Sequence, residues 1–331
     1  MAKQLTDIQK LAMDVYHSVP TTYNNTNGED AIRNLLVDSI GGTWNYYAFL
    51  DNKGKFFQVV SEIIQEPMQE TLEGIFDGVT KTETIALGDT KVVEVEDQDL
   101  FEVAMISAGN NDVSRQRVFN KQVRVETAKM AVKIYEDFDR FVAGRINFAT
   151  LIARVKKSFA NQVAKKVYNA ILSGYNSSSS AKWSKTGTFD ETKLDELIAM
   201  VEGKTGLKCS IYGTKTALGK VSSSLVTTYK SDNKVDEYLG TGFLQTYKGQ
   251  TKMIPLVNPV DKNNEFELDI DYLFILPDGQ DIVNVVFEGE PIVVENTEAG
   301  VRNDQQIEFL YEQNVGVVAL VSKYYGIYKL A

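Results

Sequence analysis

Residues 146–174, INFATLIARVKKSFANQVAKKVYNAILSG, contain a row of apolar side chains that recurs at steps of three or four. This spacing predicts one long helix, because residues three and four apart lie on the same helix face. At ~1.5 Å per residue, the helix is a rod of about 40 Å that is expected to end at Gly174. The predicted apolar stripe consists of Phe148, Ile152, Val155, Phe159, Val163, Val167 and Ile171.

The same stretch is purely basic, although the chain as a whole is acidic. The 331 residues include 35 Lys and Arg against 45 Asp and Glu, for a formal net charge of −10. The basic residues of the stretch, most of which lie off the stripe, are Arg154, Lys156, Lys157, Lys165 and Lys166. Three roles remain open for them: a solvated face, an electrostatic contact with a neighbouring subunit, or a contact with nucleic acid.

Charge is also divided along the chain. Residues 114–172 hold thirteen Lys or Arg against four Asp or Glu, whereas residues 260–331 hold four against fourteen. These opposed blocks can pair within one chain, or between neighbouring chains of a symmetric assembly.

Composition excludes several classes of function. Cys209 is the only cysteine, so disulfides within the chain and multi-cysteine zinc sites are excluded. His17 is the only histidine, so Cys-His or Ser-His-Asp catalysis would have to use this one residue near the N-terminus. No run of 18 uncharged apolar residues is present, and the start, MAKQLTDIQK, lacks the apolar core of a signal peptide. We therefore expect a cytoplasmic protein with ample material for a core, since 43% of its residues are hydrophobic.

The first half of the chain predicts helices followed by a hairpin. Two short amphipathic helices flank the polar stretch TTYNNTNGED, and a third helical run covers residues 56–64. We expect the N-terminal part to be an arm that lies over another surface. Residues 83–135 predict two strands with a polar tip near 109–114. A lone hairpin is marginally stable in water, so it needs support, for example from another subunit.

The second half predicts an α+β unit with a sheet at its centre. Asp190 is expected to cap a helix that ends at Gly203, CSIYG (209–213) to be a short buried strand, and Thr214 to begin another helix. The C-terminal residues are rich in strands.

Two carboxylate groupings are candidate chemical sites. Asp269 and Asp271 alternate along a predicted strand and could serve a glycosidase. The acidic cluster could hold a divalent cation, although its spacing matches no calcium loop; it consists of Glu94, Glu96, Asp97 and Asp99. Both patterns also arise by chance in an acidic chain. The glycine-containing stretch GTKTALGKV (213–221) departs from a phosphate-binding loop in spacing and lacks its final hydroxyl.

The order of elements resembles the major capsid proteins of tailed bacteriophages, with the Hong Kong 97-type fold. The similarity covers roughly residues 55–331 and is one of pattern rather than motif. The segments that carry it are the strand and helix KMAVKIYEDFDRFVAGRINFATLIARVKKSFANQVAKKVYNAILSG (129–174), the strand and helix KCSIYGTKTALGKV (208–221), and the closing strands IVNVVFEGEPIVVEN (282–296) and QQIEFLYEQNVGVVALV (305–321).

The resemblance implies a division of the chain. It implies an N-terminal arm (1–55), a helix that joins the arm to the loop (56–74), an extended hairpin loop (75–128), a peripheral domain with the spine helix (129–184), an axial domain (185–285), further peripheral strands (286–317) and a final axial strand (318–331). The extended loop would reach over an adjacent subunit. Its candidate tip consists of Gly109, Asn110, Asn111 and Asp112.

By the same resemblance, the chain is a non-enzymatic capsid subunit with no cofactor and no metal. It implies pentamers and hexamers in an icosahedral shell, assembled in the host cytoplasm, that encloses double-stranded DNA contacted non-specifically. A separate scaffolding protein and a portal protein are the other implied partners, and no membrane contact is expected. The alternatives are an encapsulin-like shell that encloses cargo enzymes, a carboxylate-based hydrolase, and a tail-tube or adhesion protein.

Overall fold

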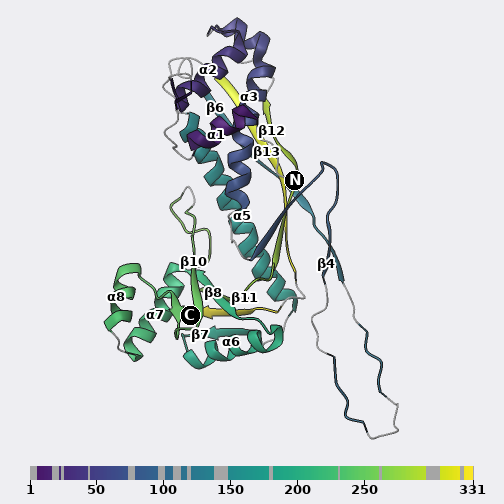
Figure 1. Cartoon of the computed structure of the whole chain (residues 1–331), viewed down its shortest axis with the longest axis vertical. Coiled ribbons are helices and arrows are strands. Elements are labelled where there is room, and N and C mark those ends of the chain that lie inside the picture. Colours follow the sequence, from purple (N-terminus) through teal and green to yellow (C-terminus); the bar gives the residue numbers. More distant parts are fainter. Residues whose placement is uncertain are drawn as a thin grey trace.

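The computed structural model describes residues 6–16, 22–23, 26–43, 45–73, 79–95, 101–106, 113–117, 121–137, 148–178, 182–229, 232–260, 263–295, 306–320 and 324–330. In these residues the molecule is elongated (Figure 1): a long helix crosses a sheet, a smaller unit lies at one end, and a hairpin projects beside it. No helix among the described residues combines the length and apolarity needed to cross a bilayer.

The long helix α5 (Phe148–Ser178) lies on a sheet with the strand order β3-β12-β13-β6. All five members of the predicted stripe whose side chains are described are buried. The helix passes through Gly174, so the predicted end was wrong; one glycine inside a helix costs only about 1 kcal/mol relative to alanine. The strands are β3 (Thr80–Ile85), β6 (Thr127–Asp137), β12 (Val283–Glu295) and β13 (Gln306–Ala319).

The helix α5 contacts both the four-stranded sheet on which it lies and the smaller unit at the end of the molecule. Phe159 packs edge-to-face on Tyr311 of β13, with ring centroids 4.9 Å apart. Two turns further on, Tyr168 packs in the same way on Phe274 of the smaller unit, at 5.3 Å, and donates a hydrogen bond to the carbonyl of Asp269 (2.9 Å). One rigid helix therefore sets the relative placement of the two units.

The N-terminal helices share this core. Thr6 and Gln9 form a capping box, because each side chain accepts a hydrogen bond from the other residue's backbone N–H, at 3.3 and 2.9 Å. Leu11, Leu36 and Phe56 are buried in the same cluster as the α5 stripe, so the described part of the expected arm lies on its own chain. The elements are α1 (Asp7–Tyr16), β1 (Thr22–Tyr23), β2 (Thr26–Asn27), α2 (Gly28–Ile40) and α3 (Tyr46–Glu73).

The smaller unit is a sheet with helices, as predicted for an α+β region. Its strand order is β7-β14-β11-β8-β10-β9. Its strands are β7 (Ser184–Gly187), β8 (Cys209–Thr214), β9 (Thr246–Tyr247), β10 (Thr251–Leu256), β11 (Tyr272–Pro277) and β14 (Gly326–Leu330). Its helices are α6 (Glu191–Thr205), α7 (Lys215–Thr228) and α8 (Asp232–Thr241).

Capping residues set the helix boundaries of this unit. Asp190 accepts a hydrogen bond from the backbone N–H of Thr192, and Thr214 accepts one from that of Ala217, which confirms both predicted caps. The end of α6 was predicted at Gly203, but the left-handed C-cap is Gly206, with φ of 68°. Gly206 adopts this left-handed conformation without the steric cost that a Cβ would add, whereas Gly203 is not among the glycines with positive φ.

Candidate intersubunit contact sites

The five basic residues of α5 do not form one surface. Lys156 is only 1% exposed, so its ammonium group does not lie on the surface of the subunit. A signal for this was present in the sequence, because Lys156 precedes the stripe residues Phe159 and Val163 by three and seven positions, which places it on the buried side. All three roles expected for the five basic residues, including the contact with a neighbouring subunit, require a surface position, so the expectation is wrong for Lys156.

The other four basic residues lie in three different environments. Lys165 Nζ is 3.9 Å from Glu267 Oε2 in the same chain. Burial lowers the pKa of Lys166. Arg154 and Lys157 are exposed. The strongest remaining candidates for a contact with another molecule are thus Arg154 and Lys157.

The projecting hairpin begins as the predicted two-stranded ribbon. Strands β4 (Val92–Val95) and β5 (Lys121–Arg124) pair antiparallel, with Val92 opposite Arg124. Farther along, Glu102 and Gln116 lie opposite each other, because the Gln116 amide exchanges two 2.7 Å hydrogen bonds with the Glu102 backbone. The candidate tip Gly109, Asn110, Asn111 and Asp112 lies outside the described residues.

A row of apolar side chains on this hairpin has no cover within the described chain. Phe101, Val103 and Met105 are 57%, 91% and 104% exposed. They alternate along the chain, as the residues on one face of a strand do. Large apolar side chains gathered in this way mark contact surfaces.

The root of the hairpin is held by a residue that the sequence analysis did not identify. Glu288 of β12 accepts hydrogen bonds from the backbone N–H of Gly88 (2.9 Å) and from the hydroxyl of Thr127. These two hydrogen bonds, with that to Thr127 the stronger influence, lower the pKa of Glu288. No short sequence pattern identifies it, because its partners lie 200 and 161 positions away.

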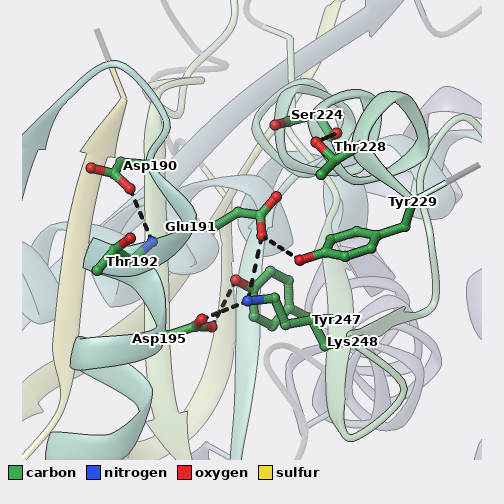
Figure 2. Close-up of polar contacts among 9 residues, drawn as sticks. All are labelled: Asp190, Glu191, Thr192, Asp195, Ser224, Thr228, Tyr229, Tyr247 and Lys248. Carbon is green, nitrogen blue, oxygen red and sulfur yellow. Dashed lines mark hydrogen bonds and ion pairs between the residues drawn. The ribbon is translucent and has the colours of Figure 1, made fainter.

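A polar cluster in the smaller unit joins α6 to the turn between β9 and β10 (Figure 2). Lys248 Nζ lies 2.5 Å from Asp195 Oδ2 and 3.4 Å from Glu191 Oε2, and Tyr247 donates a hydrogen bond to Asp195 Oδ1 (2.8 Å). The hydrogen bond to Asp195 raises the pKa of Lys248, and burial followed by the Asp195 bond raises that of Tyr247. Tyr229 donates a further bond to Glu191 (3.2 Å). Because these groups bond to one another within the chain, we assign the cluster to the stability of this unit.

The two carboxylate groupings do not form a site among the described residues. Asp269 and Asp271 precede β11 instead of alternating along a strand, which corrects the prediction, and Asp271 pairs with Lys220 at 2.8 Å. Of the acidic cluster, Glu94 is described and accepts a hydrogen bond from Gln122, whereas Glu96, Asp97 and Asp99 lie outside the described residues. No group of three or more His, Cys, Asp or Glu in the described part of the chain could hold a metal ion.

Solved structures share this fold at low sequence identity. The capsid structure of cyanophage P-SCSP1u is 11% identical, covers 78% of this chain and 88% of its own, and has a TM-score of 0.52. A chain of Microbacterium phage Oxtober96 is 11% identical, with coverage of 78% and 91% and a TM-score of 0.51. The mature capsid of bacteriophage PhiM1 gives 8% identity, coverage of 77% and 86%, and a TM-score of 0.50. The fold is therefore that of tailed-phage capsid subunits, the Hong Kong 97 type.

The family model described as "SPbeta prophage-derived putative capsid protein YonB" matches residues 7–324, and the chain belongs to this family. No curated protein matches it. The chain is a major capsid protein that assembles with copies of itself in the phage head, and it is a structural protein, not an enzyme. The predicted capsid function is confirmed, and the encapsulin and hydrolase alternatives are not favoured.

Proposed function

We propose that the subunit assembles by laying its projecting hairpin over an adjacent copy in pentamers and hexamers of an icosahedral shell. The observation that carries this proposal is the exposed row Phe101, Val103 and Met105. Moving an apolar side chain of this size from full exposure to full burial contributes about 1.5–3 kcal/mol. A second copy of the subunit can provide that burial. A two-stranded ribbon is also too thin to form a core of its own.

The proposed parts of the subunit follow the division that the family resemblance implies. In this division, α5 with β6, β12 and β13 forms the peripheral domain, and β3, from the extended loop, joins their sheet as an edge strand. The unit built on β7-β14-β11-β8-β10-β9 is the axial domain around the five-fold and six-fold positions. Residues 75–128 are the extended loop. A separate scaffolding protein, a portal protein and non-specifically contacted double-stranded DNA complete the proposed assembly, which takes place in the host cytoplasm.

Electron microscopy of the purified protein tests the hairpin contact. We expect uniform icosahedral particles from the unchanged chain and a loss of particles from Val103→Asn, with the far-ultraviolet circular dichroism of the subunit unchanged. Val257→Asn is the matched control, because Val257 is the same residue type and is 89% exposed, against 91% for Val103. Normal particles from Val103→Asn would refute the hairpin contact. Equal loss from both variants would assign the effect to exposed valines in general.

We also propose that Arg154 and Lys157 make electrostatic contacts with a neighbouring subunit. Both are exposed on α5, and the chain is acidic overall, so a neighbouring subunit offers mostly negative charge. The double variant Arg154→Glu, Lys157→Glu should assemble more slowly than the unchanged chain. Added salt should reduce this difference in assembly rate, because it screens the charges. Lys156 is excluded from this test, because a glutamate at that buried position would disturb folding itself. Assembly of the double variant at an unchanged rate in low salt would contradict the proposal.

A further inference from the structure

The strand β12 changes its course at the point where the hairpin begins. Its parallel ladder with β3 ends at the pair Glu288–Ile85, and its register with β13 shifts between Glu288 and Ile292. Gly289 has a φ of 69°, which favours glycine. This is a β-bulge, and bulges redirect side chains and bend the strand that carries them.

The bulge brings Glu288 to both strands of the hairpin. Gly88, the donor to Glu288 Oε1 at 2.9 Å, lies where the outgoing strand leaves the sheet. Thr127, the donor to Glu288 Oε2, is the first residue of β6, where the returning strand joins the sheet again. One carboxylate thus accepts a hydrogen bond from each side of the root.

A second contact at the root depends on the same bulge. A Cβ atom on Gly289 would lie 3.2 Å from the Cβ of Leu87, the residue before Gly88. The outgoing strand therefore approaches the bulge closely where a glycine permits it. Glu288 and Gly289 together define how near the hairpin lies to the sheet.

We propose that Glu288 is a positioning residue for assembly, which fixes the angle at which the hairpin leaves the sheet. The proposal rests on the proposed hairpin contact with an adjacent subunit. The angle matters because Met105 follows Gly88 by 17 residues, a separation that a chain can span over at most about 55 Å, so a tilt of about 10° at the root can move Met105 by up to about 10 Å. A displacement of that size would carry the exposed row from one contact to another on the neighbour.

The test compares Glu288→Ala and Glu288→Gln with Glu290→Gln. Glu290 is exposed two positions away and loses the same charge, which makes it a matched control. Hydrogen exchange is measured on residues 86–90 and 125–129 of the unassembled protein, and particle shape is measured by electron microscopy. We expect about fivefold faster exchange in both segments for Glu288→Ala, because a charge-assisted hydrogen bond is lost on each side. We also expect particles of mixed curvature from Glu288→Ala, and neither change from Glu290→Gln.

Glu288→Gln and Thr127→Val refine the assignment. The glutamine keeps one acceptor oxygen and replaces the other with an amide group that cannot accept, so its effect should be intermediate. Thr127→Val removes one donor, and it should add little to the effect of Glu288→Ala if both changes break the same contact. If Glu288→Ala fails to fold, Glu288→Gln and Thr127→Val carry the test.

Three results would overturn the inference or separate it from the hairpin contact. Unchanged exchange at both segments would show that Glu288 does not hold the root. Faster exchange with uniform particles would show that the root contact does not position the hairpin, which overturns the proposal equally. Normal assembly of Val103→Asn would instead refute the hairpin contact itself, whatever the exchange at the root.

Discussion

The contact between Phe159 and Tyr311 should dominate the packing of α5 on its sheet. Phe159 is 3% exposed, and its ring lies 4.9 Å from that of Tyr311, at an interplanar angle of 86°. In Phe159→Ala, the lost burial costs about 2–3 kcal/mol. The remaining void adds about 1 kcal/mol and the lost edge-to-face contact about 0.5–1 kcal/mol. We therefore expect the free energy of unfolding to fall by about 4 kcal/mol.

Substitution of the partner residue, Tyr311, by phenylalanine should raise the free energy of unfolding instead of lowering it. The Tyr311 hydroxyl is buried and has no hydrogen-bond partner among the described residues, and this burial raises its pKa. Tyr311→Phe keeps the ring contact and removes the unsatisfied hydroxyl, so we expect a gain of about 1 kcal/mol. The two variants thus separate ring packing from hydroxyl burial at one contact.

Urea unfolding of the unassembled protein, followed by circular dichroism at 222 nm, measures both effects. Ser158→Ala is the control, because this exposed neighbour on the same helix should change stability by less than about 0.5 kcal/mol. A loss below about 1.5 kcal/mol for Phe159→Ala would refute the described packing, since burial alone exceeds that value. Destabilisation by Tyr311→Phe would show that the hydroxyl is hydrogen-bonded.

Three further changes test other contacts of the fold. Lys248→Met leaves Asp195 facing a second carboxylate, and we expect a loss of about 1 kcal/mol in thermal unfolding that diminishes in high salt, because Lys248 is about a third exposed. Thr214→Val removes both the cap of α7 and the hydrogen bond to the Ile270 carbonyl, so it should lower the free energy of unfolding in urea by about 1–2 kcal/mol, with faster hydrogen exchange confined to the smaller unit. For Glu83, hydrogen bonds from Lys81 and then Lys91 lower the pKa below its ordinary value of 4.5, so its contribution is present above that pH and is lost as the pH falls through the lowered pKa. Glu83→Gln should therefore be less stable than the unchanged chain at pH 7 and equally stable in strong acid; a constant difference at all pH values would contradict this ion pairing.

The sequence predicted the periodic and capped elements well, because those features depend on neighbours along the chain. The α5 stripe, the Asp190 cap and the Thr214 cap all follow from spacings of four residues or fewer. Helix ends were less predictable, because Gly174 is compatible with a helix and the left-handed conformation of Gly206 depends on the path that follows.

The contact sites were predicted less well, for a different physical reason. Phe101, Val103 and Met105 alternate like the residues of a buried strand, and alternation does not reveal which molecule supplies the cover. Glu288 is one of fourteen acidic residues in its part of the chain, and only the folded sheet brings it to Gly88 and Thr127. Contacts between distant segments carry no local periodicity.

The opposed charge blocks of the sequence are partly paired within the subunit. Fewer of these charged residues are therefore available for contacts between subunits. On the edge strand β6, Lys129 pairs with Glu312 at 2.7 Å, and Lys133 pairs with Glu308 at 2.8 Å, both on β13. Lysines on an edge strand discourage unwanted pairing with other sheets. A subunit that must join its copies in one arrangement benefits from such an edge, because the proposed hairpin contact then meets less competition from pairing between sheet edges.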